Sequence, residues 1–506
     1  MYGKWGFSMR QMTLEAVLTA GAERNLRDAN PWWQGDRQYD VAAIKRWAYQ
    51  PVLKGLLRGL APITVLRGPR QVGKTTLLNQ VIDELLAQGV EPRRIFRVQF
   101  DDIPDLRRLS APILDLAAWY ADNVVKQSFH AFAREQGGPV YILLDEVQNL
   151  PDWATQLKHL VDLQPVRAIV TGSSALRIEA GRDSLAGRVS TIEIGPLLLR
   201  EISEMHGAHP IAPYLPYNGL SALKEKAFWQ GLRQFGEAHR ALRDEAFASF
   251  SEFGGYPLAH KRADATWEEV SSQLVETVVK RAIQHDLRIG ERGRRRDEAL
   301  LEEVFRLSCR YVGQSPSQAL YLDEVRRALD ANIGWQRILT YLKFLDATLL
   351  VRLIEPLELR LKKKKGAIKL VLCDHALRAA WLQERVPLTP GALQASPHLS
   401  DLAGHIAESV AGQLFKSIIN LDICHFPERG AEPEVDYVLT IGDQRIPVEI
   451  KYRRRIAYGD SRGLRAFIEK SVYNAPFGIL VTQGDEIASD DPRIVSLPLS
   501  SLLLMR

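Results

Sequence analysis

The chain has 506 residues, too many for one hydrophobic core, and a prior of one domain per ~150 residues predicts about three or four domains. A hydrophobic fraction of 46% and a charged fraction of 25% are ordinary for a globular protein, which excludes extensive disorder and fibrous or low-complexity architecture. The net charge of +5 is weak evidence for a polyanionic partner, so the position of the charge along the chain matters more.

The spacing of cysteines and the length of apolar stretches indicate in which cellular compartment the protein is expected. The three cysteines include no CxxC pair, so neither a disulfide framework nor a zinc site is indicated, and a reducing cytoplasm fits. No apolar stretch approaches the ~18 residues of a membrane span, and the first residues lack the apolar core of a signal peptide. We therefore expect a cytoplasmic protein with no membrane partner.

The strongest motif is a phosphate-binding loop. An apolar strand over 63–66 leads into GPRQVGKTT, and a helix with apolar residues at helical spacing follows. The glycines let backbone N–H groups point at phosphate oxygens, the lysine reaches the β- and γ-phosphates, and the threonine hydroxyl binds Mg²⁺. This pattern predicts an ATP site that comprises Gly68, Pro69, Arg70, Gln71, Val72, Gly73, Lys74, Thr75 and Thr76.

A second strand, 140–144, ends in the acidic pair Asp145 and Glu146. We expect Asp145 to hold Mg²⁺ and Glu146 to polarise the attacking water. A helix N-cap is the alternative for such a pair, but the phosphate loop favours the catalytic interpretation. The adjacent glutamate, and the absence of an [NT]KxD guanine-recognition sequence, favour ATP over GTP.

A third strand begins at 166 and has a polar end that includes Ser173, where a sensor of the γ-phosphate is expected. An ordinary loop is the alternative for this Gly-Ser-Ser sequence. Downstream, Arg182 or Arg188 could reach the ATP of a neighbouring subunit as an arginine finger, although a loop arginine is usually only solvated. An arginine acting in trans requires a repeating head-to-tail interface, which favours a closed ring, for example a hexamer.

The middle of the chain is helical and then mixed. Residues 267–287 have helical periodicity, which predicts a lid over the nucleotide. Residues 297–372 predict three helices and two strands, the order of a winged helix, with the helix over 335–346 in the recognition position. The lysines at 362–365 would lie at the wing tip, where phosphate contacts are made. A packing module without DNA contact is the alternative.

From about residue 400 the predicted order is helix, three strands, helix and strand, which is the core of the PD-(D/E)XK nuclease fold. A two-residue turn at Gly442 and Asp443 would place Asp436 opposite Glu449, with Lys451 on the same face. Two facing carboxylates need a cation between them, so a divalent metal is predicted, with Lys451 positioning its water. Two alternatives remain open: a fold that only binds nucleic acid, and a domain that mediates protein contacts.

Several motifs together resemble one bacterial and archaeal family, in family order from about residue 30 onward: NPWW, GPRQVGKTT, LLDEVQ, TGSSA, LAGR with IGPLLLREI, GGYP, and VDYV with VEIK. Its members are AAA-type ATPases with a C-terminal domain of unknown function that resembles the PD-(D/E)XK nucleases. The resemblance implies an ATPase and adds Glu408, which matches the family's helix glutamate, as a further metal ligand. It implies much less about the substrate, and the segment 206–250 matches poorly and is interpreted as a lid elaboration.

The predicted fold class is a multidomain α/β protein with a P-loop AAA+ core, a helical lid, a winged helix and a C-terminal PD-(D/E)XK-like domain. The expected boundaries are a Trp-rich segment at 1–50, the ATPase core at 51–205, the lid with its insertion at 206–296, the winged helix at 297–395 and the nuclease-like domain at 396–506.

The predicted function is an ATP- and Mg²⁺-dependent motor that translocates on or remodels DNA, whether single-stranded, duplex or branched. Three basic runs, at 288–296, 360–369 and 451–455, favour the nucleic-acid partner. Helicase or branch-migration activity is one form such a motor takes. The alternatives are a nucleotide-dependent regulatory switch that binds a protein partner, and an ATP-gated, Mg²⁺-dependent nuclease.

Overall fold

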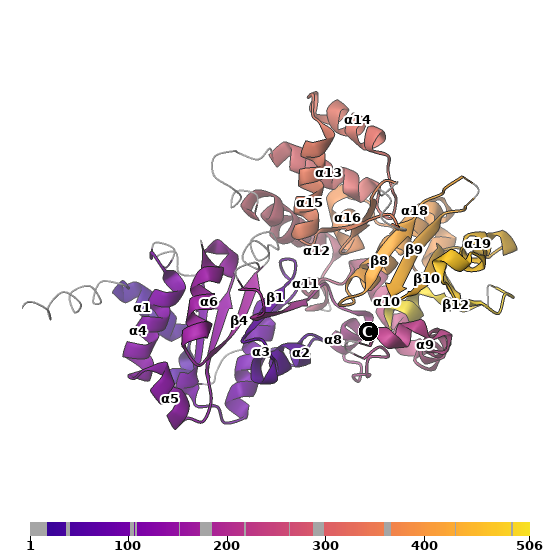
Figure 1. Cartoon of the computed structure of the whole chain (residues 1–506). Coiled ribbons are helices and arrows are strands. Elements are labelled where there is room, and N and C mark those ends of the chain that lie inside the picture. Colours follow the sequence, from indigo (N-terminus) through magenta and orange to yellow (C-terminus); the bar gives the residue numbers. More distant parts are fainter. Residues whose placement is uncertain are drawn as a thin grey trace, which may run out of the picture. The chain divides into compact units, whose positions relative to one another are not determined.

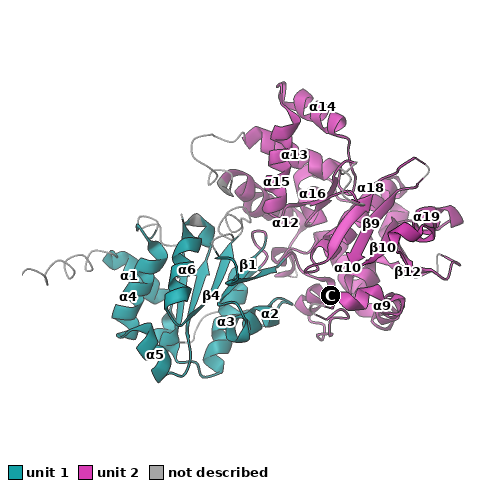
Figure 2. Cartoon of the chain, in the orientation of Figure 1, with its two compact units in different colours: residues 1–68, 73–194 teal, residues 69–72, 195–506 magenta. Residues whose placement is uncertain are grey.

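The computed structural model describes residues 18–36, 41–101, 106, 109–150, 152–172, 185–216, 219–262, 264–286, 298–358, 366–430, 432–486 and 489–506. The chain divides into two compact units, shown in teal and magenta in Figure 2: residues 1–68 with 73–194, and residues 69–72 with 195–506. Among the described residues, no helix combines the length and apolar character needed to cross a membrane.

Unit 1 is built on a parallel five-stranded sheet with the order β2-β3-β4-β1-β5. The inner strands β1, β3 and β4 are almost entirely buried, which explains why they are rich in apolar residues, whereas the edge strand β5 is mostly half-buried or exposed. The sheet places β1 between β4 and β5, and β3 between β2 and β4. The strand bounds are β1 Ile63–Arg67, β2 Ile95–Gln99, β3 Val140–Asp145, β4 Val166–Gly172 and β5 Val189–Glu193.

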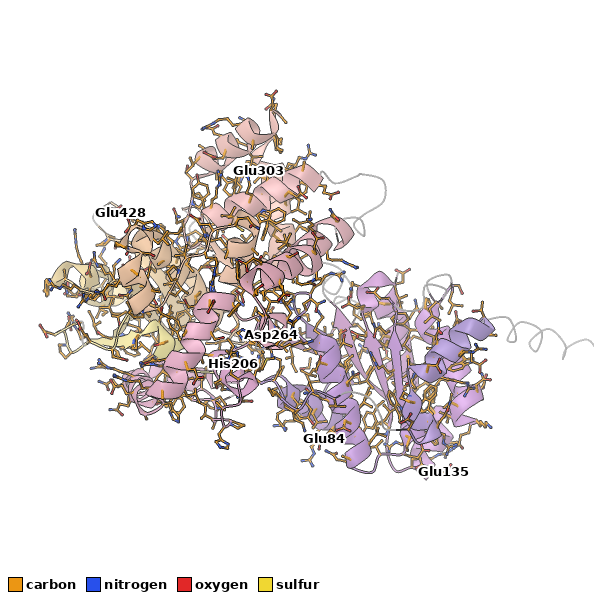
Figure 3. All side chains as sticks on the ribbon, turned by 180° about the vertical axis from the view of Figure 1, so that it is seen from behind. Glu84, Glu135, His206, Asp264, Glu303 and Glu428 are labelled. Atoms are coloured by element: carbon orange, nitrogen blue, oxygen red, sulfur yellow. The ribbon has the colours of Figure 1, made fainter. Side chains whose placement is uncertain are left out.

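Helices cover both faces of this sheet (Figure 1). On one face α2 contacts β1 and α3, and on the other α6 contacts β4 and α4. Tyr49 of α2 donates a hydrogen bond to Glu84 of α3 at 2.8 Å, which joins these two helices. Glu84 is labelled in Figure 3. The helix bounds are α1 Ala20–Asp28, α2 Tyr49–Arg58, α3 Lys74–Ala87, α4 Pro112–Tyr120, α5 Phe129–Glu135 and α6 Trp153–Leu163.

The Trp-rich segment packs against the edge of the same sheet. The indole N–H groups of Trp32 and Trp33 donate to the carbonyl oxygen of Ile95 at 3.0 and 2.9 Å. Asn30 both donates to the carbonyl oxygen and accepts from the N–H of Arg97. The NPWW sequence therefore caps the open hydrogen-bonding edge of β2 with side chains, which protects an otherwise exposed strand.

Unit 2 begins with helices. Among them, α9 and α10 contact α20 at the C-terminus, and α9 also contacts β12. The segment predicted as a lid elaboration thus packs, within unit 2, on the C-terminal sheet. Helix bounds are α8 Leu199–Met205, α9 Lys226–Ala238, α10 Arg240–Phe253, α11 Pro257–His260 and α12 Trp267–Leu274, followed by the π-helical turns η8 Val275–Val279 and η9 Arg281–Asp286.

Three helices and a strand pair follow at the predicted positions: α13 Glu298–Arg310, α14 Gln318–Leu329, α15 Trp335–Ala347, β6 Val351–Ile354 and β7 Lys369–Leu372. The strands β6 and β7 pair antiparallel. The lysines at 362–365 and the basic run at 288–296 lie outside the described residues. The assignment of this region as a winged helix stays a prediction. Helices α16 His375–Leu382 and α17 Pro390–Ala395 then lead to the C-terminal sheet.

The C-terminal sheet has the order β12-β11-β10-β9-β8. The pairing of Gln444 with Ile441 and of Val448 with Tyr437 confirms the predicted hairpin register, and Gly442 has the positive φ of 65° that its turn position favours. The bounds are α18 Ser400–Lys416, β8 Asp422–Phe426, β9 Val435–Ile441, β10 Gln444–Lys451, α19 Arg462–Glu469, β11 Gly478–Thr482, β12 Ile494–Pro498 and α20 Leu499–Leu503.

Candidate nucleotide site and C-terminal charge cluster

The phosphate loop joins β1 to the first residue of α3. Gln71 and Gly73 have left-handed φ angles of 63° and 91°, so the backbone turns sharply just before the helix begins. Lys74 is only 5% exposed, and its Nζ donates to the carbonyl oxygen of Gly68 at 3.0 Å. The ammonium is thus folded back over the loop, as expected of a lysine that contacts phosphate groups.

Asp145 lies at the carboxyl end of β3, fully buried. It accepts a hydrogen bond from the Thr75 hydroxyl at 2.7 Å and another from the Thr171 hydroxyl at the end of β4. Burial raises the pKa of Asp145, and the hydrogen bond from Thr171 opposes that rise. The structure therefore brings Thr75 and Asp145 together, 70 residues apart in the sequence.

Glu146 follows β3 directly and has a left-handed backbone with φ of 58°, so the chain turns sharply just after Asp145. Its N–H donates to the Thr171 hydroxyl at 3.3 Å, and its carboxylate accepts from the buried Gln148 amide. Thr171 and Gln148 thus hold both acidic residues in place. Sequence reasoning noted the polar end of β4 but ranked Ser173 as its functional residue, and Ser173 lies outside the described residues.

The side chains and backbone N–H groups at this site fit a nucleotide with its Mg²⁺ ion, which is the ligand that a phosphate loop implies. Lys74 and the backbone N–H groups of the loop would hold the phosphates, while Thr75 and Asp145 would hold Mg²⁺, because a hydroxyl and a carboxylate are oxygen ligands of the kind this ion prefers. Arg46 is 8% exposed, and a Cβ placed on Gly73 would lie 4.0 Å from its Cδ, so Arg46 borders the loop. No sequence motif singled out Arg46.

Arg188 directly precedes β5 and forms an ion pair within the chain. Its Nε is 2.6 Å from the Oδ1 of Asp162 in α6, with each side chain 35% exposed. The structure contains one copy of the chain, so the role of Arg188 in trans stays a prediction. The other arginine-finger candidate, Arg182, lies outside the described residues.

In unit 2 a buried lysine occupies the centre of the C-terminal charge cluster. Lys369 begins β7, its side chain is 1% exposed, and its Nζ is 3.1 Å from both the Oε2 of Glu408 in α18 and the Oδ1 of Asp436 in β9. Burial lowers the pKa of Lys369, but the carboxylates of Asp436 and Glu408 outweigh it and raise the pKa well above its ordinary value. Lys369 thus joins three elements by ion pairs.

The rest of the cluster lies along β9 and β10. Asp436 Oδ2 accepts from the N–H of Ile450 at 2.8 Å, and Lys451 Nζ is 2.5 Å from Glu449 Oε1. Burial, and then the charge of Asp436, raise the pKa of Glu449 to about 8. Burial also acts against the ionised form of Asp436, but Lys369 and Lys451 lower its pKa overall. One carboxyl of the facing pair therefore remains ionised while the other holds a proton near neutral pH.

These residues do not fit a bound divalent cation as they stand. Both oxygens of Asp436 are engaged, Glu408 Oε2 contacts Lys369, and only Glu449 Oε2 is buried without a hydrogen-bond partner. Within the described ranges no group of three or more His, Cys, Asp or Glu side chains could hold a metal ion. The assignment of Glu408, Asp436 and Glu449 as metal ligands stays a prediction, and Lys369, which sequence reasoning did not single out, lies where that cation was expected.

Comparison with known protein families gives a match for the segment that contains the phosphate loop. Residues 61–203 match the AAA domain family, residues 244–387 match a domain of unknown function (DUF8612), and residues 403–502 match another (DUF4143). The stretch that carries the phosphate loop, Asp145 and Glu146 is therefore an AAA-type P-loop ATPase domain. The match to DUF4143 assigns no activity to the C-terminal domain.

Individual relatives share only part of the chain. Uncharacterized proteins of Mycobacterium tuberculosis and Methanocaldococcus jannaschii are each 31% identical, over 145 and 139 residues, which is 28% of this chain and 27% of each relative. The chain thus spans about a quarter of the length of these relatives. A Walker-type ATPase of Pyrococcus abyssi superposes with a TM-score of 0.42 at 15% identity, over 69% of this chain and 99% of its own.

Proposed function

We propose that the chain is an ATP-hydrolysing motor that translocates on or remodels DNA, and that its C-terminal domain binds that DNA. The contact of Thr75 with Asp145 beside the buried Lys74 carries the ATPase part of this proposal, because it brings together the side chains that would hold Mg²⁺ and the phosphates. Glu146 is the base that orients the attacking water.

Charge supports the DNA part of the proposal. The chain carries 66 Lys and Arg against 61 Asp and Glu, and Arg453, Arg454 and Arg455 are all exposed on unit 2. Exposed arginines bind phosphate groups in bidentate geometry and release counterions from DNA. The order of three helices and two antiparallel strands over 298–372 is that of a winged helix, which adds a second DNA-binding element to the proposal.

The decisive experiment measures ATP hydrolysis with and without single-stranded, duplex and branched DNA. A motor should show a large stimulation by DNA that falls steeply with salt. Lys74→Ala and Glu146→Gln should each lower kcat by about 100-fold or more, since each removes a group that acts on the transferred phosphoryl group. Hydrolysis that DNA leaves unchanged would favour the regulatory switch with a protein partner.

Two further measurements belong to the same assay. Arg188→Ala should lower the rate only in an assembled oligomer if this arginine acts in trans, and an undiminished rate would remove the argument for a ring. An ATP-gated nuclease is the alternative expected from the sequence, and it requires Asp436 to leave its present contacts with Lys369 and the Ile450 N–H before a divalent cation can bind. Mg²⁺-dependent cleavage that is lost in Glu449→Ala but kept in Lys74→Ala would support that alternative.

A further inference from the structure

A basic segment with an exposed aromatic ring follows β10 in unit 2. We call its arginines Arg453, Arg454, Arg455, Arg462 and Arg465, together with Tyr458, the Arg–Tyr strip. Between 453 and 465 the only acidic residue is Asp460, so these five arginines and one aspartate give the segment a net charge of +4. Such a density of arginine around an aromatic residue is typical of surfaces that bind single-stranded nucleic acid.

Tyr458 is exposed but held in place. Its relative exposure is 80%, which is unusual for a large aromatic side chain, and the guanidinium carbon of Arg465 lies 3.8 Å from the centroid of its ring. Arg465 is itself fixed, because it donates to the Ser461 hydroxyl at 2.6 Å and to the Tyr458 carbonyl oxygen at 2.9 Å. A ring that is both exposed and pre-oriented loses little conformational freedom when a base stacks on it.

The arginines of the strip differ in whether they form ion pairs with carboxylates. Arg453 forms an ion pair with Asp460, but neither Arg454 nor Arg455 pairs with a carboxylate of the described residues. Both are exposed and lie four and three residues before Tyr458. They can therefore contact the phosphates on either side of a base that stacks on the ring.

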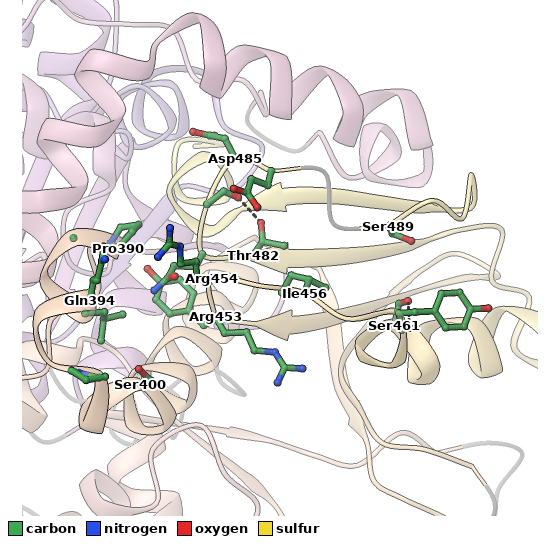
Figure 4. A pocket seen from close by; sticks show the side chains of 18 of the residues that line it. Pro390, Gln394, Ser400, Arg453, Arg454, Ile456, Ser461, Thr482, Asp485 and Ser489 are labelled. Atoms are coloured by element: carbon green, nitrogen blue, oxygen red, sulfur yellow. Dashed lines mark hydrogen bonds between the residues drawn. The ribbon is translucent and has the colours of Figure 1, made fainter.

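A pocket of about 690 Å³ adjoins this strip (Figure 4). Arg453, Arg454 and Tyr458 line it, together with polar groups that include Gln394 and Thr482. Its acidic residues lie on the segment after β11, where Asp485 is neutralised by Arg243 at 2.7 Å while Glu486 and Asp490 are exposed. The volume is in the range of ligand pockets and accommodates one nucleotide.

We infer that the Arg–Tyr strip and this pocket bind a DNA single strand, with one base stacked on Tyr458 and the flanking phosphates held by Arg454 and Arg455. This inference deepens the proposed function, because it rests on DNA as the partner and names the form of DNA and its contact surface. Stacking requires an unpaired base, so the strip discriminates single strands from duplex DNA.

The test measures fluorescence anisotropy of a labelled oligo(dT) and of a duplex of equal length with the full chain. Tyr458→Ala should weaken oligo(dT) binding by about tenfold and leave duplex binding nearly unchanged, since only the stacked base is lost. Tyr458→Phe is the matched control and should keep the affinity, because the ring remains. Replacing both Arg454 and Arg455 by Ala should reduce the magnitude of the slope of log affinity against log salt for oligo(dT) by about 1.4, because two phosphate contacts are lost.

The outcomes separate this inference from the function on which it rests. If the wild-type chain binds oligo(dT) and Tyr458→Ala binds it equally well, the inference about the Arg–Tyr strip is wrong. The proposal of a DNA-dependent motor would still stand. If the wild-type chain binds neither probe and DNA does not stimulate its ATPase activity, both proposals fail. Thermal unfolding of each variant verifies that it is folded, which the high exposure of Tyr458 leads us to expect.

Discussion

At the scale of single residues, the ammonium of Lys369 most affects how the C-terminal domain is interpreted. A buried charge is tolerated only when opposite charges compensate it, and here two carboxylates lie 3.1 Å away while the backbone oxygen of Asp436 lies 3.4 Å away. The lysine therefore supplies, from within the chain, the positive charge that Asp436 and Glu408 require.

Lys369→Met should destabilise unit 2 strongly. It removes the cation and leaves Asp436 and Glu408 buried together, a change that typically costs about 3 to 5 kcal/mol of unfolding free energy. Urea denaturation followed by tryptophan fluorescence measures this loss. The control is Lys451→Met, whose side chain is 31% exposed and whose loss solvent can partly compensate. Equal losses in the two variants would contradict a central role for Lys369.

The contact of Thr75 with Asp145 near Lys74 was predictable because these residues belong to a contiguous motif and to the end of an apolar strand, while their roles as nucleotide and Mg²⁺ ligands stay predictions. The sequence did not indicate the buried role of Lys369, which is 67 residues from Asp436 and ends the basic run 360–369 that was interpreted as favouring a nucleic-acid partner. Thr171 and Gln148 were not predicted as parts of the site for a related reason: a single polar residue has no sequence spacing that distinguishes a buried hydrogen bond from an exposed side chain.

At the scale of elements, α18 connects β7 and β9. Gly412 allows the contact, because a Cβ at this position would lie 2.4 Å from Tyr437 Oη and 3.0 Å from Val371 Cγ2. Tyr437 in turn donates to the carbonyl oxygen of Glu408 at 2.8 Å. The helix that carries Glu408 is thus held against β7, which carries its ionic partner Lys369, and against β9, which carries Asp436, the other carboxylate that contacts Lys369.

Two glycines of α18 should therefore respond in opposite directions to alanine. Gly412→Ala forces Tyr437 away from the helix and should lower the unfolding free energy by about 1 to 3 kcal/mol. Gly404→Ala meets nothing within 4 Å and should raise it by up to about 1 kcal/mol, since alanine favours the helix. Chemical denaturation of both variants gives the comparison, and a change of the same sign in both would contradict close packing at Gly412.

The hairpin register was predictable because one turn fixes every pair, and Gly442 with the alternating apolar residues of β9 and β10 left a single consistent register. The packing of α9 and α10 on β12 and α20 was not, because more than 240 residues separate the partners Arg243 and Asp485. An amphipathic helix indicates that it has a buried face but does not indicate which surface covers that face.

At the scale of the whole molecule, buried titratable groups of unit 2 should make stability depend on pH. Burial lowers the pKa of both His260 and His425 from 6.5 to about 4, so the folded chain keeps them neutral where the unfolded chain binds protons. Their contribution is complete above pH ~6.5 and is lost as the pH falls toward ~4. Glu449 acts in the opposite sense, because burial raises its pKa to about 8 and the folded chain therefore holds an extra proton below that pH.

A comparison of variants separates these opposing contributions. A chain with both His260→Gln and His425→Gln should lose less unfolding free energy than the wild type between pH 7 and pH 5, because it lacks the two groups that gain protons only on unfolding. A complete pKa shift of this size corresponds to about 3 kcal/mol for each histidine.

Glu449→Gln should change the pH profile of stability in the opposite direction. As the pH falls below 8, this variant should lose unfolding free energy more steeply than the wild type. Urea midpoints at half-unit pH steps measure all three profiles. If the double histidine variant follows the wild-type profile, proton binding on unfolding does not involve the imidazoles of His260 and His425.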